Sequence, residues 1–397
     1  MDAGNMFWRL FLINFLITLG FGIADAFFSM YLFSLGARGT LLALPLVLYS
    51  LAKVFIGPLI GRWTDRVGGV EGVVMSLFLY LLVSVGYFLT DNLASITALR
   101  ILQGVSCAMF RPIIFGLVGR CCSRGRRSTV MGTFDISFYG ALSLGPVLGG
   151  ILKDHLGYRG VFAAIVAVCL VALLVIIYRA PSQLRYTVKS ETAQAEGGEF
   201  RRLICHRGLQ GLLAFIFGRA CGISLSAVFL PIVLSTQLGL TGTQTGMVMA
   251  ASTFVVAVAL RPAGLLADKV PRKTLVVVGG TVVPLLYLLI PMMPGFSQVL
   301  MLVLGIGFFS ALSQPASSAL LLEEGSRFGM GSTVGTFNSV LNLGFISGPL
   351  LGVGIQQSCG LPAVFIVAGC LGLVTMALFV VTMTAEAWRP KFVRERK

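Results

Sequence analysis

Twelve apolar stretches, each about as long as a bilayer crossing, dominate this sequence. A spanning helix needs about 20 predominantly apolar residues, whereas a membrane barrel would show short alternating segments. Only 11% of the 397 residues are charged, against about 25% in soluble domains, so lipid must be the main solvent. The sequence predicts an all-α membrane protein with twelve transmembrane helices, over 8–34, 41–60, 72–90, 93–118, 129–152, 159–178, 209–236, 245–264, 274–293, 297–322, 332–356 and 361–384.

The net charge of +15 is unevenly divided between the two sides of the predicted membrane. With a cytoplasmic N-terminus, the outer loops hold only three basic residues, Arg38, Lys153 and Arg159. This asymmetry follows the positive-inside rule. We therefore expect a multi-pass protein of the bacterial inner membrane with both termini in the cytoplasm. The basic loops are expected to contact anionic lipids, and nucleic acid is not expected as a partner.

A polar segment divides the chain into two halves. Residues 179–208 are charged and rich in Ser, Thr and Gly, a composition typical of linkers. We expect a six-helix bundle over 1–178, a cytoplasmic linker over 179–208, and a second six-helix bundle over 209–397 that ends in a short basic tail.

The two halves repeat each other at a constant spacing of 203 residues. The register holds in four separated segments without a gap. It pairs Asp65 with Asp268, Pro112 with Pro315, Gly132 with Gly335, Gly145-Pro146 with Gly348-Pro349, Gly149 with Gly352, and Gly157 with Gly360. Parallel six-span repeats of this kind resemble the architecture of the major facilitator transporters, which implies a substrate site near mid-membrane, between the halves.

The loop after the second span resembles the loop motif of the major facilitator superfamily. It reads Gly-Arg-Trp-Thr-Asp-Arg-Val-Gly-Gly from residue 61, and the second copy reads Gly-Leu-Leu-Ala-Asp-Lys-Val-Pro-Arg-Lys from residue 264. The first copy ends in Gly69 where the family has a basic residue, and Pro271 replaces a glycine in the second. The resemblance implies a gating role on the cytoplasmic side for Asp65, Arg66, Asp268 and Lys269. A turn that serves only topology is the alternative.

Two further motifs resemble the proton-coupled branches of this superfamily. Span four contains Leu-Arg-Ile-Leu-Gln-Gly around Arg100, where the family ties the arginine to proton transfer; an arginine that extends to the outer interface is the alternative. Span five matches the drug:proton antiporter motif G-x8-G-x3-G-P-x2-G-G, except for Ala141. Small residues at this spacing let helix backbones approach closely, so the pattern also predicts helix packing by Gly132, Gly145, Pro146, Gly149, Gly348 and Pro349.

Ionisable residues inside spans are candidates for function because lipid makes them costly. Five of the six lie in the first half: Asp25, Lys53, Arg100, Arg111 and Asp135, with Arg219 in the second. Asp25 and Asp135 are equal candidates for the residue that carries the proton, and depth counting predicts a cluster of Lys53, Asp135 and Arg111. A static ion pair that orients helices remains the alternative for this cluster. Arg100 alone matches the depth of Asp25.

Substrate binding is expected between the halves. The repeat aligns Arg111 with Gln314 and Asp135 with Asn338. We expect Gln314, Asn338 and Arg219 to meet the substrate, with Phe138 in an apolar wall; a role of Arg219 in packing between the halves is equally open. The cavity charges fit anionic, zwitterionic or amphiphilic molecules at least as well as simple organic cations.

The sequence therefore predicts a proton-coupled exporter that works by alternating access. Its partners would be protons, membrane lipids and a small-molecule substrate, and it would act as a monomer without cofactor or metal. No phosphate-binding G-x4-G-K-S/T motif occurs, and no nucleophile–base pair predicts an enzyme. Two alternatives stay open: a proton symporter that imports a small organic anion or metabolite, and a membrane sensor that no longer transports.

Overall fold

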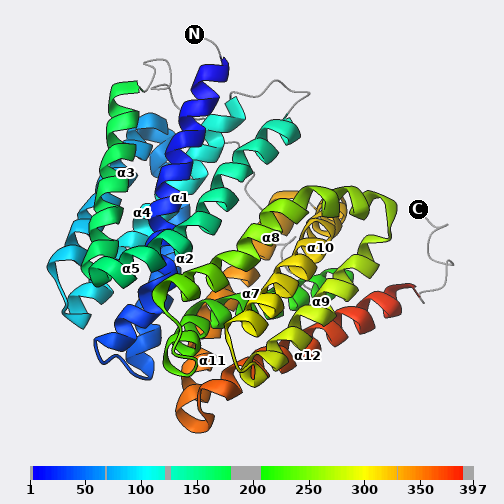
Figure 1. The fold of residues 1–397 in the computed structure, drawn as a ribbon. Coiled ribbons are helices and arrows are strands. Elements are labelled where there is room, and N and C mark those ends of the chain that lie inside the picture. Colours follow the sequence, from blue (N-terminus) through cyan, green and yellow to red (C-terminus); the bar gives the residue numbers. More distant parts are fainter. Residues whose placement is uncertain (1–2, 68, 121–126, 180–206, 329, 388–397) are drawn as a thin grey trace.

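The computed structural model describes residues 3–67, 69–120, 127–179, 207–328 and 330–387 (Figure 1). Apart from short connections, these residues form helices, and they contain no strand. The first half holds α1 (Ala3–Ser34), α2 (Thr40–Val67), α3 (Gly69–Leu89), α4 (Leu93–Arg120) and α5 (Arg127–Arg179). The second half holds α7 (Arg207–Thr236), α8 (Gly242–Lys269), α9 (Arg272–Leu289), the 3₁₀ turn η2 (Ile290–Met292), α10 (Phe296–Phe328), α11 (Met330–Cys359) and α12 (Leu361–Ala387). Most of the predicted linker, residues 180–206, lies outside the described residues.

Helix α5 contains two membrane spans in one continuous element. Its apolar part, Thr133–Tyr178, is 46 residues long, about twice the length of a bilayer crossing. Gly157 interrupts it with φ 67° and ψ −170°, a backbone conformation open to glycine but strained for other residues. In α2, the apolar stretch Thr40–Ile56 is shorter, although the whole helix has 28 residues. If α5 is counted as two spans and α2 as one, the helices are consistent with the twelve predicted spans.

The 203-residue repeat is visible in the backbone. Gly36 and Gly239 both have positive φ, at 86° and 61°, and Gly157 and Gly360 do so at 67° and 85°. Each pair is one repeat apart, so equivalent helices of the two halves end in the same way. The packing repeats as well: α1 packs on α5 as α7 packs on α11, and α2 packs on α4 as α8 packs on α10.

The two halves meet mainly through α5 with α8, α2 with α11, and α1 with α7. In Figure 1 their ribbons lie side by side at the end opposite the N-terminus and diverge toward the N-terminal end. We call the closed end the Asp154 end, after the residue that contacts α8 there. Large apolar side chains such as Phe55, Met301 and Val374 are 65–71% exposed on the outer faces of helices, as expected for a surface in contact with lipid.

Candidate functional site

An ion pair inside the first half joins α1 to α4. A guanidinium nitrogen of Arg100 donates to the Asp25 carboxylate. The Arg100 side chain is 1% exposed, whereas that of Asp25 is 36% exposed. Arg100 therefore does not extend to the membrane interface, and that alternative is wrong. The two residues that sequence depth alone had matched are in direct contact, with the acid as the accessible partner.

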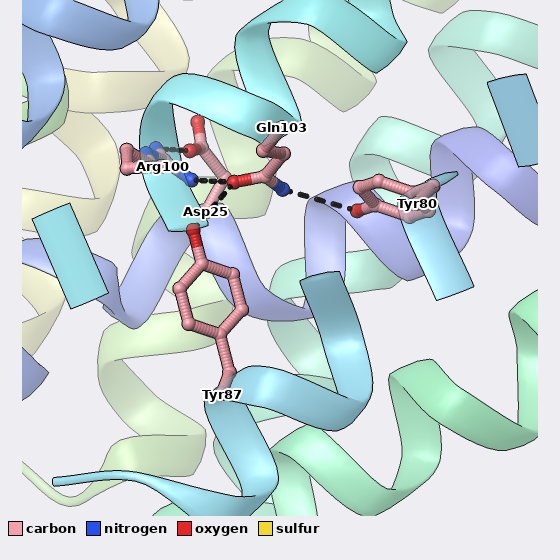
Figure 2. A network of polar contacts seen from close by, with 5 residues as sticks. All are labelled: Asp25, Tyr80, Tyr87, Arg100 and Gln103. Carbon is pink, nitrogen blue, oxygen red and sulfur yellow. Dashed lines mark hydrogen bonds and ion pairs between the residues drawn. The ribbon is translucent and has the colours of Figure 1, made fainter. Parts of the chain in front are cut away.

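Arg100 is fixed by further contacts on α4 and its neighbours (Figure 2). Its Nη1 donates to Oε1 of Gln103 at 2.6 Å, and the Tyr87 hydroxyl donates to the same oxygen at 3.1 Å. Nε2 of Gln103 lies 3.4 Å from the Tyr80 hydroxyl. Apart from Asp25, the network holds the cation in one place through neutral partners.

Aromatic rings enclose the same guanidinium. Its carbon lies 4.0 Å from the ring centroid of Phe28 and 4.7 Å from that of Tyr49. Rings at this distance stabilise a desolvated cation by about 2 kcal/mol. Nζ of Lys53 lies 4.8 Å from the same Tyr49 ring, so Tyr49 separates two of the predicted charges. Arg100 is thus held as a permanent cation in an apolar setting.

A second polar chain crosses between the halves. Nη2 of Arg219 on α7 donates to Oε1 of Gln314 on α10 at 2.9 Å, and Nε2 of Gln314 donates to the Tyr139 hydroxyl on α5 at 2.9 Å. Phe138 packs edge-on against Tyr139, with ring centroids 5.4 Å apart. The structure thus brings together Arg219 and Gln314, two of the four residues expected to meet substrate, and it adds Tyr139 as the contact on the other half. Asn338, the fourth, is exposed on α11.

The predicted cluster of Lys53, Asp135 and Arg111 stays a prediction. Asp135 is half-buried on α5, one helical turn before Tyr139, and Lys53 is half-buried on α2. The side chain of Arg111 lies outside the described residues. Asp135 therefore lies near the chain of Arg219, Gln314 and Tyr139, while Lys53 lies near Arg100.

The predicted gating residues fall largely outside the described part of the chain. This holds for the side chains of Asp65, Arg66 and Asp268, while Lys269 is exposed at the end of α8. A contact between the halves is described at the other end of the molecule. It is made by Asp154, which belongs to none of the sequence motifs.

Asp154 completes the hydrogen bonding of the α8 N-terminus. The first four N–H groups of a helix have no partner within it. Here Thr241 and Gln244 form a capping box that satisfies two of them, at 3.1 and 3.2 Å. The carboxylate of Asp154 accepts the other two, from Gly242 and Thr243, each at 2.7 Å. It also accepts from the Thr243 hydroxyl at 2.7 Å.

The Asp154 carboxylate lies in the connection between the spans predicted over 129–152 and 159–178. Partial burial raises its pKa, but the hydrogen bonds from Thr243 and Gly242 outweigh this effect and hold the pKa below its usual range. The ionised form is therefore the one that joins the halves. Its position also suits the positive end of the α8 dipole.

The repeat supplies a weaker equivalent of this contact. The residue 203 positions after Asp154 is Gln357, and the residue 203 positions before Gly242 is Gly39. These two also meet across the halves: a Cβ built on Gly39 would lie 1.8 Å from Nε2 of Gln357. Only one of the two symmetry-related contacts has a carboxylate. The repeat register was the signal that could have identified Asp154.

The glycines of the span-five motif allow close backbone contacts. A Cβ on Gly145 would lie 2.6 Å from the carbonyl carbon of Gly22, and one on Gly149 would lie 2.4 Å from the carbonyl oxygen of Ile23. These contacts bring α5 against α1. Gly150 meets the α8 backbone instead, with 2.3 Å from its ideal Cβ to the carbonyl oxygen of Gly242.

The second copy of the motif packs in an equivalent way. A Cβ on Gly348 would lie 1.9 Å from Oγ of Ser224 and 3.0 Å from the carbonyl oxygen of Cys221. The motif therefore joins α11 to α7 as it joins α5 to α1. Pro146 and Pro349 lie inside α5 and α11. Gly132 lies in the first turns of α5, and its packing lies outside the described part of the structure.

Comparison with known proteins identifies the family. The model of the Major Facilitator Superfamily matches residues 10–220 and 212–397. Multidrug resistance protein 2 of Bacillus subtilis (strain 168) is 23% identical over 372 residues, or 92% of each chain. Multidrug resistance protein MdtG of Dickeya zeae (strain Ech586) is 27% identical, over 89% of this chain and 88% of the relative. The class D tetracycline resistance protein of Salmonella ordonez is 26% identical over 77% of each.

Solved structures share the same fold. The nucleoside transporter NupG superposes with a TM-score of 0.79 at 12% identity, over 96% of this chain and 99% of the other. A bacterial homologue of the lysosomal transporter Spinster, in an inward-facing and unoccupied conformation, gives 0.74 at 13% identity, over 96% and 95%. The chain therefore belongs to the major facilitator superfamily and is a membrane transporter.

Proposed function

We propose that this transporter exports a small amphiphilic or anionic molecule across the bacterial inner membrane in exchange for protons. Its relatives include proteins named for multidrug and tetracycline resistance, which supports export. The observation that carries the proposal is the ion pair between Asp25 and Arg100. It combines a permanent, buried cation with a carboxylate that is 36% exposed and thus accessible to protons.

Protonation of Asp25 would change the balance of charge in the first half. The neutral carboxyl group no longer compensates Arg100, while Gln103 and the rings of Phe28 and Tyr49 keep the guanidinium in place. A conformational equilibrium shifts when a ligand, here the proton, binds the two states with different affinity. Proton binding at Asp25 therefore favours whichever state tolerates the unpaired cation better. Asp135 is the second candidate for this role, with Lys53 and Arg111 as its proposed partners.

The positive-inside rule supports a cytoplasmic N-terminus, which makes the Asp154 end the outer side. The contacts of the halves at that end then correspond to an inward-facing state. Asp154 would hold the outer side closed while substrate enters from the cytoplasm. Asp65 and Asp268, with their basic neighbours Arg66 and Lys269, would act at the cytoplasmic side in the opposite state.

We place the substrate between the halves, next to the hydrogen bond from Gln314 to Tyr139. Phe138 supplies an apolar face there, and Asn338 is exposed on α11. Arg219 orients Gln314 through its hydrogen bond. A substrate that competes for the Gln314 amide would replace a contact between the halves, which couples its binding to their relative motion.

Transport in proteoliposomes with an imposed pH gradient tests the proposal. We expect the wild-type protein to accumulate a lipophilic test substrate against its gradient, and Asp25→Asn to bind the substrate without pH-driven accumulation. Asp91→Asn is the matched control, because this exposed acid of the same half pairs loosely with Arg159 at 3.7 Å. Full coupling in Asp25→Asn would refute the role of Asp25. Loss of coupling in Asp135→Asn instead would assign the proton to Asp135. In inverted vesicles an exporter takes up substrate in exchange for protons. Movement of substrate and protons in the same direction would favour the symporter instead.

A further inference from the structure

A small cavity lies inside the second half, enclosed by α7, α9, α10 and α12. Its volume is about 30 Å³, and a buried water needs about 10–15 Å³ on the same measure. It therefore has room for one monatomic ion with a water molecule. Pockets for organic ligands measure about 300–1,000 Å³, so the cavity is too small for a transported drug.

Arg219, a half-buried cation, lines the cavity and has no ion-pair partner among the described residues. Nε of Arg219 is buried and has no hydrogen-bond partner among the described residues, and Nη2 donates to the neutral amide of Gln314. No carboxylate in the described part of the chain forms an ion pair with Arg219. The guanidinium stays charged in proteins, so burial cannot be relieved by loss of a proton.

The acids of the second half all lie far from this cavity along their helices. Between residues 207 and 387 the acids are Asp268, Glu323, Glu324 and Glu386. All four lie in the last turns of α8, α10 and α12, at the N-terminal end of the molecule, whereas Arg219 is in the middle of α7. Arg100 in the first half is compensated by Asp25. Charges taken out of water are normally paired, and the bundle around the cavity offers Arg219 no carboxylate, so an anion from outside the chain would complete the site.

The remaining polar groups of the cavity are hydroxyls. They belong to Tyr287, Ser310, Ser313 and Thr375. Ser313 and Thr375 donate to carbonyl groups of their own helices at 3.1 and 3.0 Å, and a hydroxyl hydrogen can rotate toward another acceptor. A Cβ on Gly218 would lie 2.0 Å from Oγ1 of Thr375, so glycine in α7 lets this hydroxyl approach beside Arg219.

We propose that this cavity binds one small inorganic anion, the size of chloride, against the guanidinium of Arg219. The hydroxyls of the wall would donate to the same ion. Bound there, the anion neutralises the charge inside the bundle without blocking the hydrogen bond from Arg219 to Gln314. The site adjoins the proposed substrate region through the hydrogen bond from Arg219 to Gln314, but it does not depend on the direction of transport or on proton coupling.

Thermal unfolding of the purified, lipid-reconstituted protein tests the proposal without a transport assay. Chloride replaces gluconate at constant sodium and ionic strength. We expect a saturable rise in Tm of roughly 2–5 °C, because a ligand that binds only the folded state stabilises it. Bromide should act like chloride, and sulfate, which is larger, should not. No chloride-specific rise would overturn the proposal.

Variants of Arg219 assign the effect to the site. Arg219→Leu should abolish the chloride response; its counterpart in the repeat is Leu16, so leucine suits the helix position. Arg219→Lys should keep the response with at least about tenfold weaker binding, and Arg219→Gln should lose it, which maintains the test if the leucine variant does not fold. Arg159→Leu, at an exposed arginine, should respond as wild type. An equal response in all Arg219 variants would refute the site. Loss of transport in these variants without any chloride effect would assign Arg219 to the substrate instead.

Discussion

Replacing Asp154 with Asn is expected to shift the protein away from the state in which its halves meet at the Asp154 end. The carboxylate accepts three hydrogen bonds from the first turn of α8, all at 2.7 Å. When the halves separate, the N–H groups of Gly242 and Thr243 lose this acceptor. The neutral amide of Asn keeps one acceptor oxygen and loses the interaction with the helix dipole.

The size of the shift in the conformational equilibrium can be calculated from the known contributions of helix capping and of the helix dipole. Loss of a capping side chain costs about 0.5–2 kcal/mol, and a charge at an exposed helix N-terminus contributes about 0.3–1 kcal/mol. Because Asp154 is exposed and Asn retains part of the hydrogen bonding, we expect a net shift of about 1–2 kcal/mol. This corresponds to a change of about 5- to 30-fold in the ratio of the two conformations.

Double electron–electron resonance between spin labels at positions 92 and 297, in place of Asn92 and Ser297, measures the distance between the halves at this end. Both residues are exposed at the Asp154 end, in different halves and away from the contact itself. Asp154→Asn should raise the population of long distances. Asp91→Asn, which affects contacts with Tyr31 and Arg159 inside one half, should not. An unchanged distribution in Asp154→Asn would refute the reasoning.

The same contact has a defined dependence on pH. The pKa of Asp154 is lowered in this state, so its stabilising contribution is present above the usual carboxyl pKa of about 3.9 and is lost only as pH falls through the lowered value. The label distances should therefore show no change due to Asp154 between pH 5 and 8. A change in that range that Asp154→Asn removes would contradict the assignment.

Two further predictions concern the interface and the packing. Tyr139→Phe removes the acceptor of Gln314 and should alter the distribution of conformations by about 0.5–1.5 kcal/mol, seen in the same distance measurements; no change would mean that this hydrogen bond does not join the halves. Gly149→Ala places a methyl group 2.4 Å from the carbonyl oxygen of Ile23 and should destabilise by about 1–3 kcal/mol. Its control is Gly140→Ala, whose methyl group meets nothing within 4 Å; equal Tm values for the two variants would contradict the close packing.

The depth of charges in the sequence predicted one contact of the site, the pairing of Arg100 with Asp25. Arg100 and Asp25 were matched because each is a costly charge at the same level of the membrane, and such charges find partners. The contact of Gln314 with Tyr139 could not be predicted in this way. A neutral amide and a phenol tolerate many surroundings, so their pairing depends on how α10 and α5 approach each other.

The sequence by itself determined the helices, the repeat and the family. Lipid forces each span to satisfy its own backbone hydrogen bonds, so apolar length and glycine positions specify the elements, and the 203-residue register shows that they form two related bundles. Only the tertiary structure decided which helices of the two halves meet, and at which end of the molecule. The role of Asp154 arises because the middle of α5, where its two spans connect, lies against the first turn of α8. The lack of a carboxylate beside Arg219 within its own bundle arises because the enclosing helices hold their acids at distant ends. Both depend on distances between separate helices, which no local pattern encodes.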